Sequence, residues 1–183
     1  TERILDILKN ENVKATFFVV GKHVKELPHM VKREYEEGHY LANHGYTHNN
    51  SKLYSNFLEE VTKTEQEIGK AIGDLDYCSH IFRFPNGYMS KSYKYEKNIA
   101  RKILNKLDYG YIDWNCLNKD SEVKISNVQL IENLKKTSKN KKVLVILMHD
   151  TGDVNNSSEV LKESIRYLKN EGYEFKNMYD LLY

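Results

Sequence analysis

Two histidines are the first residues of this chain whose types and spacing could do chemistry. His44 and His48 stand four residues apart, behind a short extended run at residues 38–42. Four residues are slightly more than one helical turn, so in a helix or a tight turn both rings face the same way. Two neutral imidazoles directed at one point are a common start of a divalent-metal site, for zinc in particular. The same spacing also occurs between unrelated surface histidines, so the rest of the chain has to separate the two interpretations.

Composition sets limits on the class of protein. The chain has 183 residues, enough for one domain with a sizeable core, and its net charge of +2 gives no argument for nucleic-acid binding. The sequence contains no apolar run of about 18 residues, so we expect no membrane span, and its first residues carry no signal peptide. Its two cysteines, Cys78 and Cys116, allow neither a disulfide framework nor a Cys-rich zinc site, although one bridge stays open.

The apolar pattern predicts alternating helices and buried strands. Residues 14–21 form a nearly continuous apolar run with aromatic and β-branched side chains, as in a strand buried on both faces of a parallel sheet. Residues 142–148 form the strongest strand in the chain, and Asn127 is expected to cap the helix before it. Such alternation implies right-handed crossovers and a parallel sheet or barrel. The other expected strands are residues 40–42, 79–84, 110–114 and 173–175, and the expected helices are residues 1–9, 28–37, 57–72, 92–107, 127–138 and 157–170.

Polar residues with chemical uses follow these strands. His44 and His48 come after the strand at 40–42, Arg83 ends the strand at 79–84, Asp113 lies near the end of 110–114, and His149 follows 142–148. The carboxyl-terminal edge of a parallel sheet is where active sites form in α/β folds. Scattered surface histidines would not produce such a pattern.

Each of these residues also has a plainer interpretation. His149 beside Asp150 at a strand end could be a structural hydrogen-bonding pair, and Arg83 a surface cation. Asp113 followed by Trp114 could be a capping carboxylate beside a core indole. For each residue considered alone, the plainer interpretation is favoured. The occurrence of all four segments in order along the chain favours an active site.

In this order and spacing, four segments resemble motifs of the polysaccharide deacetylases with the NodB homology domain, carbohydrate esterase family 4. Residues 43–48 (Asn-His-Gly-Tyr-Thr-His) are similar to the family's metal motif, and residues 83–87 (Arg-Phe-Pro-Asn-Gly) to its Arg-x-Pro motif. Residues 113–114 (Asp-Trp) and 147–149 (Leu-Met-His) are similar to its Asp-Trp and Leu-x-His motifs. The resemblance runs through residues 1–183 and implies a single domain with an α/β fold, a distorted (β/α) barrel.

The resemblance also implies roles for the catalytic residues. His44 and His48 would hold the metal, zinc or another divalent ion such as cobalt. His149 would be the general acid that protonates the leaving sugar amine, because the pKa of histidine lies near operating pH. Asp113 would orient His149 and stabilise its charge, and Arg83 would hold the catalytic base.

Three further residues would contact the substrate by the same resemblance. The backbone N–H of Asn86 would help to stabilise the tetrahedral oxyanion, and Trp114 and Leu147 would form the wall of an apolar pocket for the acetyl methyl group. Many relatives have an aromatic residue where this chain has Asn86. That change keeps the backbone donor but removes a surface on which a sugar could stack.

The family's first motif, Thr-Phe-Asp-Asp-Gly, does not occur in the 183 residues. It would precede the helix at residues 1–9 and supply the catalytic base and the third metal ligand; Asp6 lies within that helix and matches neither. We expect an incomplete amino terminus, with degeneration of the site or completion by another chain as alternatives. The expected barrel then lacks its first strand, leaving sheet edges at residues 16–20 and at the last strand open to dimer formation. Weak zinc binding and low activity are expected from this chain.

The resemblance implies metal-dependent hydrolytic N-deacetylation of N-acetylglucosamine-type residues in a cell-wall polysaccharide, with peptidoglycan ahead of chitin or acetylated xylan. A non-catalytic carbohydrate-binding relative is the alternative. An extracellular or cell-wall location follows from the same resemblance. An Asp-Asp pair in the reading frame upstream of Thr1 would favour the enzyme.

Overall fold

The computed structural model describes residues 1–121, 125–150 and 154–182. The chain divides into two compact units. The central unit comprises Ala15–Asp113 and Asn177–Tyr183, and the flanking unit comprises Thr1–Lys14 and Trp114–Lys176. That residues 1–183 form a single domain stays a prediction.

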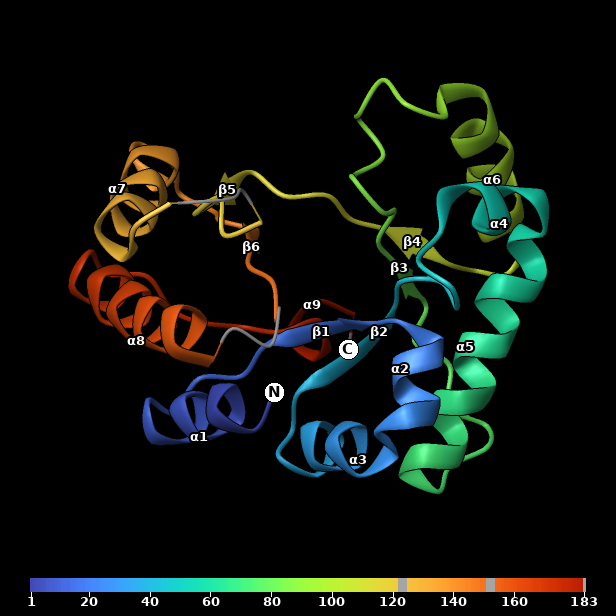
Figure 1. Ribbon diagram of the computed structural model, residues 1–183, viewed down its shortest axis with the longest axis horizontal. Helices are drawn as coiled ribbons and strands as arrows, with labels where there is room; N and C mark the ends of the chain where they lie inside the picture. Colours follow the sequence, from blue (N-terminus) through green and yellow to red (C-terminus); the bar gives the residue numbers. More distant parts are fainter. Residues whose placement is uncertain (122–124, 151–153, 183) are drawn as a thin grey trace. The chain divides into compact units, whose positions relative to one another are not determined.

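A four-stranded parallel sheet in the order β1-β2-β3-β4 forms the centre of the central unit (Figure 1). Its first pair is in register from Thr16 opposite Tyr40 to Val19 opposite Asn43. Among the described strands β1 pairs on one side only, with β2, which agrees with the open edge expected there. The elements of this unit are β1 Thr16–Val19, α2 Gly21–Glu26, α3 Pro28–Glu36, β2 Tyr40–Asn43, α4 Asn50–Ser55, α5 Phe57–Ile72, β3 Ile81–Phe82, α6 Lys94–Lys106, β4 Gly110–Tyr111 and α9 Tyr179–Leu182.

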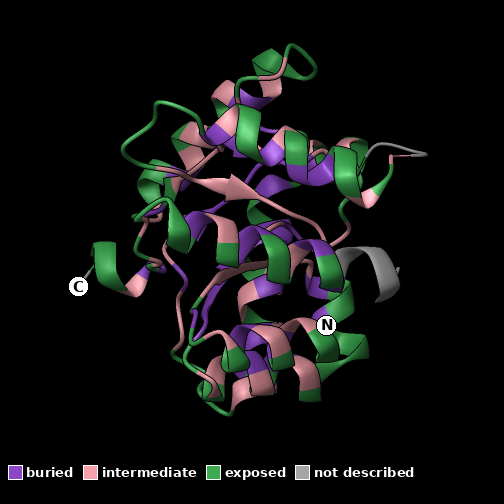
Figure 2. Cartoon of the chain, turned by 90° about the vertical axis from the view of Figure 1, so that its left-hand side faces the viewer, coloured by how far each residue is buried: buried purple, intermediate pink, exposed green. Residues whose placement is uncertain are grey.

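Helix α5 organises the packing of the central unit, because α2, α3, α4 and α6 all contact it. Phe57 and Val61 bury one end of α5 in a core shared with Phe82 of β3, and Ile68 buries the other end beside Leu41 of β2. The approach of α2 to α5 depends on Gly21, since a Cβ there would lie 2.7 Å from the Thr64 hydroxyl. The helices that face the viewer in Figure 2 are buried on one side and exposed on the other.

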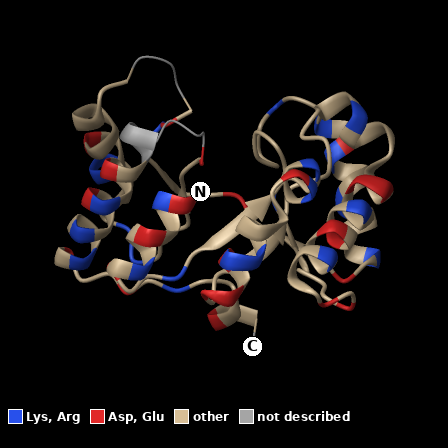
Figure 3. Cartoon of the chain, turned by 60° about the horizontal axis from the view of Figure 1, so that its bottom comes forward, with Lys and Arg blue, Asp and Glu red and all other residues tan. Residues whose placement is uncertain are grey.

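The flanking unit contains two parallel strands, β5 Cys116–Leu117 and β6 Ile146–Leu147, and three helices. The helices are α1 Glu2–Asn10, α7 Asn127–Ser138 and α8 Val154–Asn170; α8 contacts both of the others (Figure 1). Ser126 caps α7 in a capping box with Gln129, so the expected cap at Asn127 was wrong by one residue. Lys and Arg alternate with Asp and Glu along the helices (Figure 3), and none of the described helices is long and apolar enough to cross a membrane.

The strand expected at residues 142–148 is much shorter than its apolar pattern indicated. Only Ile146–Leu147 pairs as a strand, and the backbone before it hydrogen-bonds to a side chain. The Asn115 amide donates to Val143 O at 3.0 Å and accepts from Val145 N–H at 2.8 Å. One side-chain amide thus satisfies two backbone groups of the segment, and Val145 O accepts the backbone N–H groups of Asn115 and Cys116.

The strand expected at residues 173–175 was wrong. These residues have no regular structure, and the N–H of Tyr173 instead bonds to Leu168 O at the end of α8. The rings of Tyr173 and Phe175 pack against the core around Cys116 and Leu134. Their apolar pattern reflects this side-chain burial and not strand pairing.

Buried tyrosines predict a loss of stability at alkaline pH. Burial raises the pKa values of Tyr77 and Tyr109 in the folded state, whereas in the unfolded chain the pKa of a tyrosine is about 10. Their contribution to stability is present below that pH and is lost as the pH rises above it. Burial also raises the pKa of Tyr54, which adds to this loss. Arg83, whose pKa burial lowers to about 10, and Lys97, whose pKa burial also lowers, act in the opposite direction, so three tyrosines oppose two cations.

We therefore expect the Tm to fall from about pH 10 upward. Thermal unfolding followed by circular dichroism at increasing pH measures this fall, and the fall should be less steep in Tyr77→Phe. The control is Tyr95→Phe, at an exposed tyrosine. A Tm that stays constant through this range would contradict the prediction.

Candidate active site

The two histidines lie in a tight loop that follows β2. Their ring centroids are 4.9 Å apart, with the planes inclined at 46°. The loop turns through two left-handed residues, Gly45 with φ +79° and His48 with φ +54°. At Gly45 a Cβ would lie 2.9 Å from Leu53 Cδ1, so backbone angle and space both favour glycine there. The structure brings His44 and His48 together, as the sequence predicted.

Buried acceptors hold this loop in place. Glu60 of α5 accepts the backbone N–H groups of Tyr46 and Thr47 through the same oxygen, Oε2, at 2.8 Å each. The Asn43 side chain, fully buried, accepts the Gly45 N–H at 2.9 Å. Hydrogen bonds to an ionised acceptor are the stronger kind, so α5 fixes the loop on which the imidazoles stand.

We expect Glu60→Ala to lower the free energy of unfolding by about 1–3 kcal/mol, because two loop N–H groups lose a charged acceptor. Glu60→Gln should lose less, since its amide oxygen can still accept both bonds. Urea unfolding measures the difference, with the exposed neighbour Glu59→Ala as the control. Equal stabilities of Glu60→Ala and the control would refute this role.

A backbone carbonyl sets the orientation and tautomer of His44. Its Nδ1 lies 2.6 Å from the carbonyl oxygen of Arg83. A carbonyl can only accept, so Nδ1 carries the proton and the lone pair of the neutral ring is at Nε2. Metal-ligating histidines commonly have such a second partner, which fits His44 as a ligand through Nε2.

The donor set fits part of a metal site. Two imidazoles suit zinc, but a catalytic zinc takes three protein ligands. Among the described residues no group of three or more His, Cys, Asp or Glu side chains is placed to hold an ion. That His44 and His48 act as two of the ligands of such a site stays a prediction.

Arg83 is buried beneath the same loop. Its Nε donates to Ile112 O at 3.1 Å, and its guanidinium lies 3.8 Å from the ring centroid of Phe18. Burial lowers the pKa of Arg83 to about 10, an effect that the nearby charge of Asp113 opposes. The guanidinium stays charged at neutral pH and links the ends of β3 and β4. Its predicted role in holding the catalytic base stays a prediction.

Asp113 contacts the turn that carries Asn86. Its two carboxylate oxygens accept the backbone N–H groups of Tyr88, at 2.8 Å, and Met89, at 3.0 Å. Asn86 itself has a left-handed backbone with φ +62°. The predicted contact between Asp113, in the central unit, and His149, in the flanking unit, stays a prediction.

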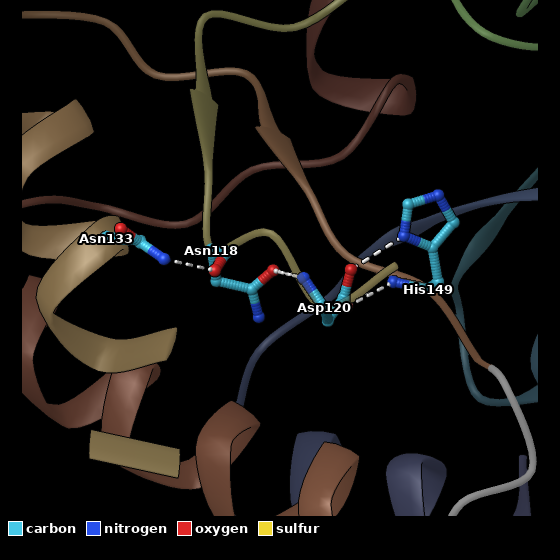
Figure 4. Close-up of polar contacts among 4 residues, drawn as sticks. All are labelled: Asn118, Asp120, Asn133 and His149. Carbon is cyan, nitrogen blue, oxygen red and sulfur yellow. Dashed lines mark hydrogen bonds and ion pairs between the residues drawn. The ribbon is translucent and has the colours of Figure 1, made fainter. Parts of the chain in front are cut away.

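Within the flanking unit His149 bonds to a carboxylate that the sequence reasoning missed. Its Nδ1 lies 2.7 Å from Asp120 Oδ1, and its backbone N–H donates to Asp120 Oδ2, also at 2.7 Å (Figure 4). The Asp120 side chain is 9% exposed and that of His149 is 40% exposed. The ring is therefore held by a shielded carboxylate and remains accessible.

Two asparagines support Asp120. The side-chain oxygen of Asn118 accepts the Asp120 N–H at 3.1 Å, and its backbone carbonyl accepts from Asn133 of α7 at 3.3 Å (Figure 4). Asn118 is fully buried. Asp120 follows β5, a strand of two residues, which is too short to be recognised from its pattern. No pattern therefore placed a carboxylate at a strand end there.

Trp114 and Leu147 also lie in the flanking unit. Both are partly exposed, and Leu147 pairs with Leu117 across β5 and β6. A partly exposed indole and an aliphatic side chain suit an apolar wall, and their contact with an acetyl group stays a prediction.

Comparison with known proteins adds a family model and similar relatives. The model described as polysaccharide deacetylase matches residues 1–112. A peptidoglycan-N-acetylglucosamine deacetylase from Bacillus cereus is 33% identical over 184 residues, which cover 96% of this chain and 63% of that protein. The chain thus spans less than two thirds of that curated relative.

Solved structures confirm the predicted fold class. The catalytic domain of a peptidoglycan N-acetylglucosamine deacetylase from Eubacterium rectale superimposes with a TM-score of 0.84 at 28% identity, covering 96% of this chain and 81% of that one. A carbohydrate esterase family 4 pseudoenzyme from Bacillus anthracis superimposes with a TM-score of 0.81 at 29% identity, covering 100% of this chain and 60% of that one.

Proposed function

Because the chain belongs to the polysaccharide deacetylase family, we propose that it takes part in hydrolytic N-deacetylation of a cell-wall polysaccharide. The substrate class is N-acetylglucosamine-type residues, with peptidoglycan ahead of chitin or acetylated xylan. The relative from Bacillus cereus named above supports peptidoglycan. A cell-wall-associated or extracellular location follows from that substrate.

The bond between His149 and Asp120 carries the proposal. A carboxylate accepts only, so the Asp120 contact fixes the proton of neutral His149 on Nδ1 and sets the orientation of the ring. The protonated ring can give its Nε2 proton to the departing amine. Water would lose one proton to the catalytic base and add to the acetyl carbon, and the C–N bond would break as the sugar nitrogen takes a proton from His149. The acetyl group leaves as acetic acid, which gives its proton to solvent and becomes acetate.

Residues of the central unit would bind the other reacting groups. His44 and His48 would hold a divalent metal, zinc first and cobalt next, which when bound polarises the amide carbonyl and lowers the pKa of a bound water. The backbone N–H of Asn86 would donate to the oxyanion, and Arg83 would hold the catalytic base.

Two imidazoles are fewer than the three protein ligands of a catalytic zinc. We therefore expect these 183 residues alone to bind zinc weakly and to show low activity. The open edge of β1 would allow dimers by strand pairing, which size-exclusion chromatography tests.

A non-catalytic carbohydrate-binding protein is the second candidate. The pseudoenzyme from Bacillus anthracis is structurally similar to this chain, so the fold occurs without the activity. Binding of N-acetylglucosamine oligomers without acetate release would favour this candidate.

The test is acetate release from N-acetylglucosamine hexamers and from peptidoglycan, with added zinc. We expect slow acetate release from the unaltered protein and its loss in His44→Ala and in His149→Ala. His29→Ala, at an exposed histidine on α3, is the control. Activity that survives both substitutions would refute the assigned roles.

A further inference from the structure

In the turn at residues 84–90, side chains from other elements hydrogen-bond both to backbone N–H groups and to backbone carbonyls. It follows β3 and contains Asn86, the proposed oxyanion donor, and two successive left-handed residues, Asn86 and Gly87. Within the turn, the Gly87 N–H bonds to Phe84 O at 2.8 Å. The direction of the Asn86 N–H in such a turn is constant only if other elements hold the backbone of the turn in one conformation.

Lys97 of α6 bonds to the carbonyl side of the turn. Its ammonium donates to Gly87 O at 2.6 Å and to Ser90 O at 3.3 Å, and it also bonds to the Ser90 hydroxyl. The residue is 2% exposed. An ammonium has three N–H donors, and these three acceptors account for them.

Asp113 bonds to the N–H side, through Tyr88 and Met89. It also compensates the buried charge, because Asp113 raises the pKa of Lys97 whereas burial, the larger effect, lowers it. A buried lysine is rare in proteins and costly to retain unless it is paired and hydrogen-bonded.

We propose that Lys97, together with Asp113, is a positioning residue that fixes the Asn86 turn before substrate binds. This inference rests on the proposed function, in which the Asn86 N–H stabilises the oxyanion. A donor held in advance costs no reorganisation in the transition state, so its loss affects kcat more than KM. The elements that fix it are α6 through Lys97 and the segment after β4 through Asp113.

The test compares Lys97→Met with Lys102→Met, the same substitution at an exposed position of α6. In Lys97→Met, hydrogen exchange of the Tyr88 and Met89 amides should accelerate at least about tenfold while amides of α5 keep their protection. The kcat for acetate release should fall by about 10–100-fold with KM changed less than about twofold. Ser90→Ala, which removes one of the three acceptors, should change both quantities in the same direction but less, and it serves if Lys97→Met fails to fold.

Unchanged exchange in the turn would overturn the inference, whatever the activity. Faster exchange with unchanged kcat would also overturn it, since Lys97 would then hold the turn without serving catalysis. Absence of acetate release by the unaltered protein would refute the proposed function, and the exchange comparison would still decide whether Lys97 holds the turn.

Discussion

Replacing His149 by alanine is expected to lower kcat for acetate release by about 10²–10⁴-fold, the usual contribution of a general acid. The reason is the loss of the only group to which the proposed reaction assigns proton transfer to the sugar nitrogen. Initial rates with N-acetylglucosamine hexamers measure the change. Circular dichroism of the variant confirms that the fold is intact.

Asp120→Asn extends the same experiment to the carboxylate. Asp120 accepts two hydrogen bonds from His149, whereas an amide has one acceptor oxygen and an NH2 group that can only donate. In Asp120→Asn the bond to Nδ1 is therefore lost or reversed, and its reversal puts the proton of the neutral ring on Nε2. We expect a large fall in kcat and, in the double variant with His149→Ala, little further loss, because the two residues act as a unit. The exposed Asp76→Asn is the control. Additive effects of the two substitutions would contradict the coupling.

Replacing His44 or His48 by alanine is expected to weaken zinc binding by more than about 100-fold. Loss of a residue that only hydrogen-bonds to a metal ligand already lowers metal affinity by roughly 10–100-fold. Each substitution removes one of two imidazoles, and a single imidazole among the described residues leaves little affinity. Competition with a chromophoric chelator measures the dissociation constant, and His29→Ala is again the control. Equal zinc affinity in the unaltered chain and in both variants would show that the ion binds elsewhere.

The sequence predicted the site best where a motif coincides with a loop after a strand. His44 and His48 were recognised because four residues separate them, and the structure places their rings together. Helix α5 was also predicted with its bounds, since it shows a strong apolar period and ends before Gly73, and the start of helix α7 was predicted to within one residue.

The sequence failed where long-range side-chain bonds replace a local pattern. Asp120 follows a two-residue strand, which leaves no periodicity to recognise. The apolar run before His149 looks like a long strand, but the Asn115 amide takes the place of a neighbour over part of it. Short elements such as α2 and α4 were missed because six residues carry too little pattern.

The interrupted order of the flanking unit has a consequence for synthesis. Its first helix, α1, buries Leu5 and Leu8 and contacts α8, which lies more than 140 residues later in the chain. Glu11, at the end of α1, pairs with Arg166 of α8 at 3.0 Å. On a ribosome that adds about 5–20 residues per second, α1 emerges roughly 7–30 s before its partner. The central unit can pack its residues 15–113 during this interval, while the apolar face of α1 stays available to chaperones.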